Sequence, residues 1–148
     1  PVLPMAQLTF SIQGTDLVAD ARVNLDAPTL LKHSTTGQPA PHSIPARALI
    51  DTGSDVSLVS GWILQQLGAQ RLFHRNTQGM GGTVSAGVFR VSISILDASR
   101  PPPWFTRPDV CVMELSAGLP FDVIIGMDVL LECRLLVDGP NRTFTIDF

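Results

Sequence analysis

Apolar and polar residues alternate with a period of two along much of the chain. Leu8, Phe10 and Ile12 alternate with Thr9 and Ser11, and a longer segment at 88–96 follows the same pattern. This period is typical of strands with one buried face, because successive side chains of a strand point to opposite sides. The chain also has 12 glycines and 12 prolines, which divide it into short extended pieces. The pattern therefore predicts an all-β barrel or sandwich.

The N-terminal part predicts one hairpin and one long loop. Residues 6–25 contain two extended segments around a Gln13-Gly14-Thr15 turn, and we expect these segments to pair as a hairpin. Residues 27–45 carry prolines among serine, threonine and glycine, which predicts a Pro-rich loop insertion. Residues 98–109 contain the run Pro101-Pro102-Pro103, which a sheet does not accommodate, and they predict a second surface insertion.

Two segments favour a short helix. Residues 61–67 follow Ser60, which we expect to cap the helix, and precede Gly68, which suits a helix C-terminus. Residues 127–133 suit a second short helix. Further extended segments are expected at 47–50, 56–59, 110–113, 121–126, 134–137 and 143–148. With no internal repeat and no second boundary, residues 1–148 predict a single domain.

The apolar strand at 48–50 ends abruptly in Asp51, which is followed by Thr52, Gly53 and Ser54. A carboxylate placed directly after a buried strand lies where water is scarce, which is a catalytic setting. Thr52 supplies a hydroxyl, Gly53 permits a tight turn, and Ser54 can hydrogen-bond the carboxylate. These are the components of an acid-base site.

One carboxylate cannot both deprotonate a water and protonate a carbonyl in the same step, so the site needs a second acid. The chain contains no second Asp-Thr-Gly or Asp-Ser-Gly triplet. A twofold homodimer supplies one, because an isologous interface repeats every residue at the axis. We therefore expect Asp51 to work as half of a paired site.

A second glycine cluster, formed by Gly79, Met80, Gly81 and Gly82, separates two extended arms. Glycines at such a position predict the tip of a flexible hairpin. A third notable segment, at 123–130, consists of an apolar strand that ends in Ile125 and Gly126 and continues into the expected helix.

Composition and charge exclude several classes of partner. The formal net charge is −3 and the pI is about 5.4, and no cluster of lysine and arginine is longer than a pair. This argues against binding to nucleic acid or to an anionic membrane surface. The apolar runs are too short to span a membrane. The N-terminal residues do not have the pattern of a signal peptide.

The histidines and cysteines, which are common metal ligands, are few and scattered along the chain. The spacing of His33, His42 and His74 does not suit a metal site, and no cofactor is expected. Cys111 and Cys133 are interpreted as two buried, reduced thiols. They slightly favour the cytoplasm, although two cysteines are too few to decide the compartment.

Three blocks in this order resemble the retropepsins, single-domain aspartic proteases of retroviral type that act as homodimers. Residues 48–54 resemble the catalytic loop, residues 79–82 the flap tip, and residues 123–130 the apolar-glycine segment with its helix. The resemblance implies a closed acid-protease barrel with one or two short helices and a glycine-rich flap hairpin. It covers residues 46–148 and, weakly, the N-terminal hairpin.

The resemblance also implies a role for each block. Two Asp51 carboxylates share one proton and hold the water that attacks a peptide carbonyl, without a metal or cofactor. Thr52 braces the loop across the dimer, Ser54 contacts the acid, and Gly79, Met80, Gly81 and Gly82 reach the backbone of a polypeptide substrate. Ile125 and Gly126 are structural and lie under the loop.

Two other interpretations stay open at this point. A retropepsin-like domain that no longer cleaves would serve as a dimerisation or peptide-binding module. An unrelated β-barrel that binds small ligands would require the Asp51 triplet to be accidental. The chain also departs from the pattern at Met127, where retroviral enzymes often carry an arginine that forms an ion pair.

Overall fold

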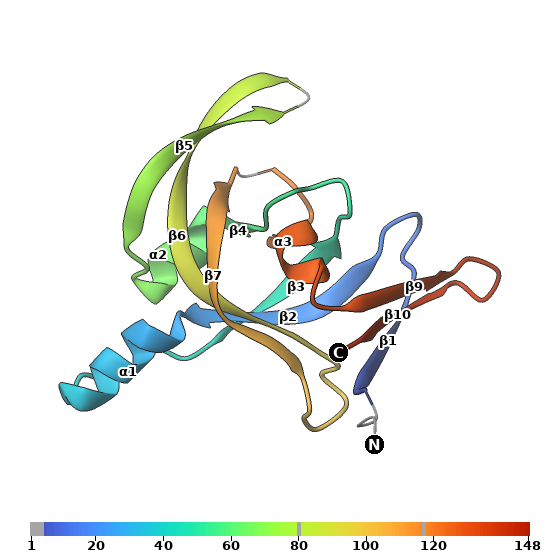
Figure 1. Ribbon diagram of the computed structural model, residues 1–148, viewed down its shortest axis with the longest axis horizontal. Coiled ribbons are helices and arrows are strands. Elements are labelled where there is room, and N and C mark those ends of the chain that lie inside the picture. The colour runs from blue at the N-terminus through green and yellow to red at the C-terminus, as the bar shows by residue number, and fades with distance from the viewer. Residues whose placement is uncertain (1–4, 80, 117) are drawn as a thin grey trace.

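The computed structural model describes residues 5–79, 81–116 and 118–148, and in these residues the chain is mostly β, as predicted (Figure 1). The strands are β1 (Gln7–Ser11), β2 (Val18–Leu25), β3 (Ile44–Ile50), β4 (Leu58–Ser60), β5 (Arg71–Gly79), β6 (Gly82–Leu96), β7 (Phe105–Leu115), β8 (Val123–Ile125), β9 (Arg134–Asp138) and β10 (Thr143–Asp147). The helices are α1 (Ala27–Thr35), α2 (Gly61–Leu67) and α3 (Met127–Leu130).

The larger sheet closes on itself as a barrel. Its strand order is β2-β3-β8-β4-β7-β6-β5, and an additional pairing of β2 with β6 completes the ring. Strand β6 is 15 residues long, so its second half closes the barrel while its first half pairs with β5 outside it. The resulting β5–β6 hairpin rises from the barrel in Figure 1. The predicted closed barrel with a glycine-tipped hairpin is confirmed.

The smaller sheet joins the two ends of the chain and corrects the predicted N-terminal hairpin. Its order is β1-β10-β9, and β1 pairs with β10 in antiparallel register from Gln7↔Asp147 to Ser11↔Thr143. Strand β2 pairs instead with β3 and β6. Residues 6–25 are therefore two strands of different sheets, connected by a turn in which Gln13 and Asp16 form an isolated bridge.

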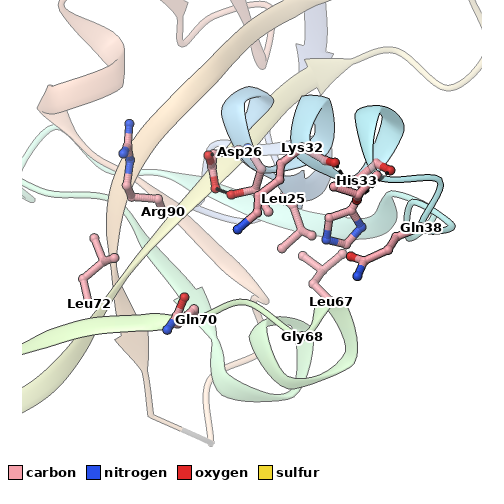
Figure 2. A pocket seen from close by; sticks show the side chains of 12 residues that line it. Leu25, Asp26, Lys32, His33, Gln38, Leu67, Gly68, Gln70, Leu72 and Arg90 are labelled. Atoms are coloured by element: carbon pink, nitrogen blue, oxygen red, sulfur yellow. Dashed lines mark hydrogen bonds between the residues drawn. The ribbon is translucent and has the colours of Figure 1, made fainter.

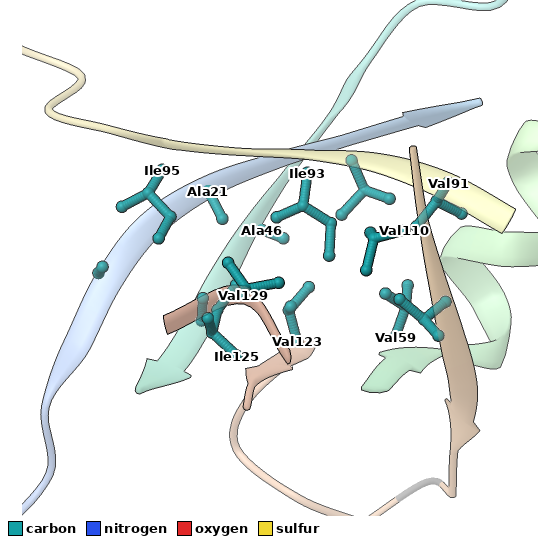
Figure 3. Close-up of a cluster of buried hydrophobic side chains, with 14 of the residues drawn as sticks. Ala21, Ala46, Val59, Val91, Ile93, Ile95, Val110, Val123, Ile125 and Val129 are labelled. Carbon is teal, nitrogen blue, oxygen red and sulfur yellow. The ribbon is translucent and has the colours of Figure 1, made fainter. Parts of the chain in front are cut away.

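Branched aliphatic side chains fill the barrel, as the alternating pattern predicts. Figure 3 shows side chains from β2, β3, β4, β6, β7, β8 and α3 converging on one cluster. Val23, Val59, Val112, Val123 and Ile125 are fully buried. These β-branched residues pack well on pleated surfaces, and their burial holds β8 between β3 and β4.

Residues 27–45 are not the predicted loop, because they contain α1. Asp26 caps this helix: its carboxylate accepts from Thr29 N at 3.1 Å and from Thr29 Oγ1 at 2.8 Å. Pro28 lies in the first turn, where the missing N–H costs no intrahelical hydrogen bond. The proline that indicated a loop is therefore compatible with a helix N-terminus.

Two of the remaining boundaries differ from the predictions, and one expected capping bond is absent. Residues 98–109 are an insertion only as far as Trp104, because β7 begins at Phe105. Helix α2 has the predicted bounds, and Gly68 ends it in a left-handed conformation, but Ser60 makes no side-chain capping bond. Helix α3 ends at Leu130, three residues before the predicted end.

Cys111 is exposed, which is contrary to the prediction of two buried thiols, and Cys133 is half-buried; both cysteines are free. In the part of the chain that the structure describes, no helix has the length and apolarity needed to cross a bilayer.

Candidate active site

Asp51 lies where β3 leaves the barrel. Its backbone N–H donates to Ile125 O at 2.9 Å, which prolongs the parallel pairing of β3 with β8. The preceding residue, Ile50, is buried, whereas Asp51 is half-buried and Thr52 is exposed. A rigid core strand thus carries the acid to the surface of the barrel.

The loop after Asp51 turns back on the carboxylate. The N–H of Gly53 donates to Asp51 Oδ1 at 2.9 Å, and the N–H of Ser54 donates to Asp51 O at 3.2 Å. A Cβ atom at Gly53 would lie 3.1 Å from Oδ1, so glycine allows this close approach. The turn therefore holds Oδ1 of Asp51 in a hydrogen bond with Gly53, and Oδ2 takes no part in that bond.

The hydroxyl of Ser54 does not have the role expected for it. It donates to Val56 O at 2.6 Å, within the loop, so it braces the backbone instead of contacting Asp51. The carbonyl of Ser54 accepts from Met127 N at 2.8 Å, and the carbonyl of Asp55 accepts from Asp128 N at 3.2 Å. The N–H groups at the start of α3, which have no partner within the helix, therefore hold the loop.

Gly126 lies directly against the loop. A Cβ atom at this position would lie 2.6 Å from Val56 O and 2.7 Å from Ser54 O, both backbone atoms. No side chain fits there without moving the loop. Gly126 therefore packs against the backbone of the loop, and the fully buried Ile125 precedes it in β8.

Ser57 and Asp128 form a polar link under the loop that sequence reasoning missed. The hydroxyl of Ser57, which is fully buried, donates to Asp128 Oδ1 at 2.7 Å and accepts from Gly126 N at 3.0 Å. The N–H of Ser57 donates to Asp128 Oδ2 at 2.9 Å. These bonds join the residue just before β4 to the residues before and within α3. The only sequence signal is a polar residue inside an apolar strand.

The glycine cluster lies at the end of the β5–β6 hairpin. Gly79 pairs with Gly82, and Gly82 has a φ of 108°, which favours glycine. Gly79, Gly81 and Gly82 are exposed. Met80, the fourth residue expected at the flap tip, lies outside the described residues.

Two cavities lie away from Asp51. One, of about 540 Å³, lies between α1 and the segment from the end of α2 to the start of β5, as Figure 2 shows. Lys32, His33 and Gln38 border it on the α1 side, and Leu67 and Gln70 border it on the other. The second, of about 520 Å³, lies at the base of the β5–β6 hairpin. Within the described residues, no group of histidine, cysteine and acidic side chains could hold a metal ion.

Comparison with known proteins gives a family and a fold. A family model described as aspartyl protease matches residues 37–129. No curated protein matches the chain.

Among solved structures, a retropepsin-like aspartic protease from Rickettsia conorii is similar with a TM-score of 0.64 at 11% identity. The match covers 97% of this chain and 92% of that one. EIAV protease, solved with the inhibitor HBY-793, gives a TM-score of 0.47 at 19% identity, covering 84% of this chain and 95% of that one.

The first of these structures shares the fold across nearly the whole length of both chains. The segment matched by the family model contains the Asp51 loop, the β5–β6 hairpin and Gly126. The blocks 48–54 and 79–82 thus lie inside the matched region, and so does the block 123–130 except for its last residue.

Proposed function

The chain belongs to the aspartyl protease family, and we propose that it is an aspartic endopeptidase that works as a homodimer. The observation that carries the proposal is Asp51, held at the end of a core strand with Oδ1 bonded to Gly53 and the next two residues exposed. A twofold axis beside this exposed turn would place two Asp51 carboxylates together.

The paired site hydrolyses a peptide bond with one proton shared between two acids. The ionised carboxylate removes a proton from a water, whose oxygen attacks the peptide carbonyl carbon. The protonated carboxyl group donates its proton to the carbonyl oxygen, which gives a tetrahedral diol. As the diol collapses and its C–N bond breaks, the ionised carboxylate takes a proton from a diol hydroxyl and the protonated carboxyl group gives its proton to the leaving nitrogen. The two acids thus exchange roles and end with one shared proton.

The substrate is a polypeptide in an extended conformation, with apolar residues beside the scissile bond. Extended binding is supported by the β5–β6 hairpin, because the backbone of a strand-like ligand can pair with strand edges. Gly79, Gly81 and Gly82 leave the backbone of the hairpin tip open to such a ligand.

Asp51→Asn tests the chemistry. The variant keeps the shape of the side chain, so we expect the folded protein to be retained and cleavage of a mixed peptide library at about pH 4 to 7 to fall roughly 10²- to 10⁴-fold. A statine-type inhibitor should suppress the activity of the unchanged protein. Asp20→Asn, at an exposed acid of β2, is the matched control and should cleave normally. Undiminished cleavage by Asp51→Asn would refute the proposal.

A mixing experiment tests the shared site. If each site needs two intact copies, an equal mixture of unchanged and Asp51→Asn chains, allowed to exchange subunits, should keep about one quarter of the activity at constant total protein. Independent sites would keep about one half. A dimer that binds peptides and cleaves none of them would instead indicate the silent module.

A further inference from the structure

The cavity at the base of the β5–β6 hairpin is built from four parts of the fold. Its volume is about 520 Å³. His74 of β5 and the segment 84–87 of β6 form one side, residues 60–62 at the start of α2 form another, and residues 114–116 at the end of β7 complete it. The cavity is separate from Asp51 and from the glycine tip, so the proposed catalytic site does not use it.

Glu114 supplies a carboxylate to this cavity. Its side chain is exposed, and none of the salt bridges among the described residues includes it. The carboxylate lies directly over Gly61, where a Cβ atom would collide with Oε1. The absence of a side chain at Gly61 therefore leaves room for the acid at the cavity wall.

Trp62 supplies an aromatic surface beside this acid. Its indole N–H donates to Asp122 Oδ1 at 3.3 Å, which anchors one edge of the ring. The side chain nevertheless stays 48% exposed, and it lines the cavity. Tryptophan is enriched at binding interfaces, because the indole combines a large apolar surface with a polar N–H.

The charges at the cavity favour a cation. Glu114 lines it, and the carboxylate of Asp122, outside the lining, accepts the hydrogen bond of the Trp62 indole. Among the lining residues, His74 is the one basic side chain, and it lies on β5. The hydroxyls of Ser60, Ser85 and Ser116 add hydrogen-bond acceptors.

We propose that this cavity binds a lysine or arginine side chain of a polypeptide, with the cationic group between Glu114 and Trp62. A guanidinium or ammonium group pairs with a carboxylate and also stacks on the face of an indole. The cavity beside α1 differs in charge, because its lining includes Lys32, His33 and Arg90 together with Asp26. This binding site goes beyond peptide hydrolysis, and its occupancy does not depend on Asp51.

The test is a titration with acetyl-Gly-Arg-Gly-amide, followed by NMR through the indole N–H resonance of Trp62. Trp62→Phe assigns this resonance, and the indole of Trp104, which lies outside the cavity, is the internal reference. At about pH 7.5 we expect a saturable shift of the Trp62 resonance with a dissociation constant on the order of 1 mM. The same peptide with citrulline in place of arginine, which keeps the shape and lacks the charge, should bind at least about fivefold more weakly.

Two variants test the geometry. Glu114→Gln keeps the size of the side chain and should weaken binding of the arginine peptide at least about fivefold, whereas Asp20→Asn changes the net charge equally and should not. Gly61→Ala keeps the acid but displaces it, and should also weaken binding. An unmoved Trp62 resonance, equal affinity for the citrulline peptide, or unchanged affinity in Glu114→Gln would overturn the proposal. These readouts do not involve cleavage, so they stand or fall separately from the protease activity.

Discussion

The hydroxyl of Ser57 donates to Asp128 across 71 residues of sequence and at the same time accepts the N–H of Gly126. Ser57→Ala removes this hydroxyl and leaves a buried N–H and a carboxylate oxygen short of a partner. We expect the free energy of unfolding to fall by about 1–3 kcal/mol. Denaturant unfolding measures the loss.

The comparison of Asp128→Asn with Asp128→Ala identifies the part played by hydrogen bonding. Asparagine keeps one acceptor oxygen for Ser57, so Asp128→Asn should destabilise the fold less than Asp128→Ala does. Equal losses for the two variants, or a Ser57→Ala variant as stable as the unchanged protein, would contradict the assigned link.

Gly126→Ala should displace the Asp51 loop. The added methyl group would meet two backbone carbonyls at 2.6 and 2.7 Å, and backbone cannot move aside as a flexible side chain can. We expect a loss of about 1–3 kcal/mol in the free energy of unfolding and a loss of peptide cleavage. The matched control is Gly139→Ala, because a Cβ atom there meets nothing within 4 Å. If both variants unfold at the same denaturant concentration, Gly126 is not the steric contact described.

Asp26→Ala should loosen α1 and leave the barrel folded. The carboxylate caps the helix through Thr29, and loss of such a cap costs about 1 kcal/mol. Hydrogen exchange at residues 30–35 should accelerate, while exchange in β6 and β7 should stay unchanged. Asp26→Asn retains the capping oxygen and serves as the control. Protection of α1 that survives the alanine substitution would show that packing, and not the cap, holds the helix.

The two cysteines should differ in reactivity. Burial, with a smaller contribution from Glu132, raises the pKa of the Cys133 thiol to about 11, and Arg107 opposes this shift. At pH 8 only about one Cys133 side chain in 1,000 is therefore in the thiolate form. Because the thiolate is the reactive form, Cys133 should react slowly with a disulfide reagent. Exposed Cys111 should react first, and Cys111→Ser should remove the fast phase alone. A single fast phase for both thiols would contradict this.

The same shift gives a dependence of stability on pH. The native state favours the protonated thiol of Cys133, so its contribution is complete below the usual pKa of 9.0 and is lost as the pH rises towards about 11. Cys133→Ser should flatten this part of the stability profile, measured by denaturant unfolding from pH 8 to 11.

Local chemistry made parts of the fold predictable from sequence. Gly68 ends α2 because its left-handed backbone suits glycine, and the run 48–53 specifies a strand, an acid and a turn within a few residues. Alternation, by contrast, identifies a strand without naming its partner. It therefore placed β1 correctly and paired it wrongly, since the true partner, β10, lies more than 130 residues away.

The other misses also reflect information that is not local. Pro28 alone indicates a loop. Once Asp26 is identified as the N-cap, Pro28 falls in the first turn of the helix, where proline is accepted. Ser57 and Asp128 are unremarkable apart, and only the barrel brings them together. The family resemblance singled out Asp51, Gly126 and the tip of the β5–β6 hairpin as candidate site residues, but it could not indicate that the hydroxyl of Ser54 bonds Val56.

The pairing of β1 with β10 has a consequence for biosynthesis. Thr9 is translated 136 residues before its partner Thr145. Asp51 is likewise translated before Ile125, whose carbonyl accepts its N–H. A nascent chain that ends before these partners can form neither the pairing of β1 with β10 nor the backbone bond of Asp51 to Ile125. The backbone bond that holds Asp51 at the end of β3 is thus completed only after β8 has been translated.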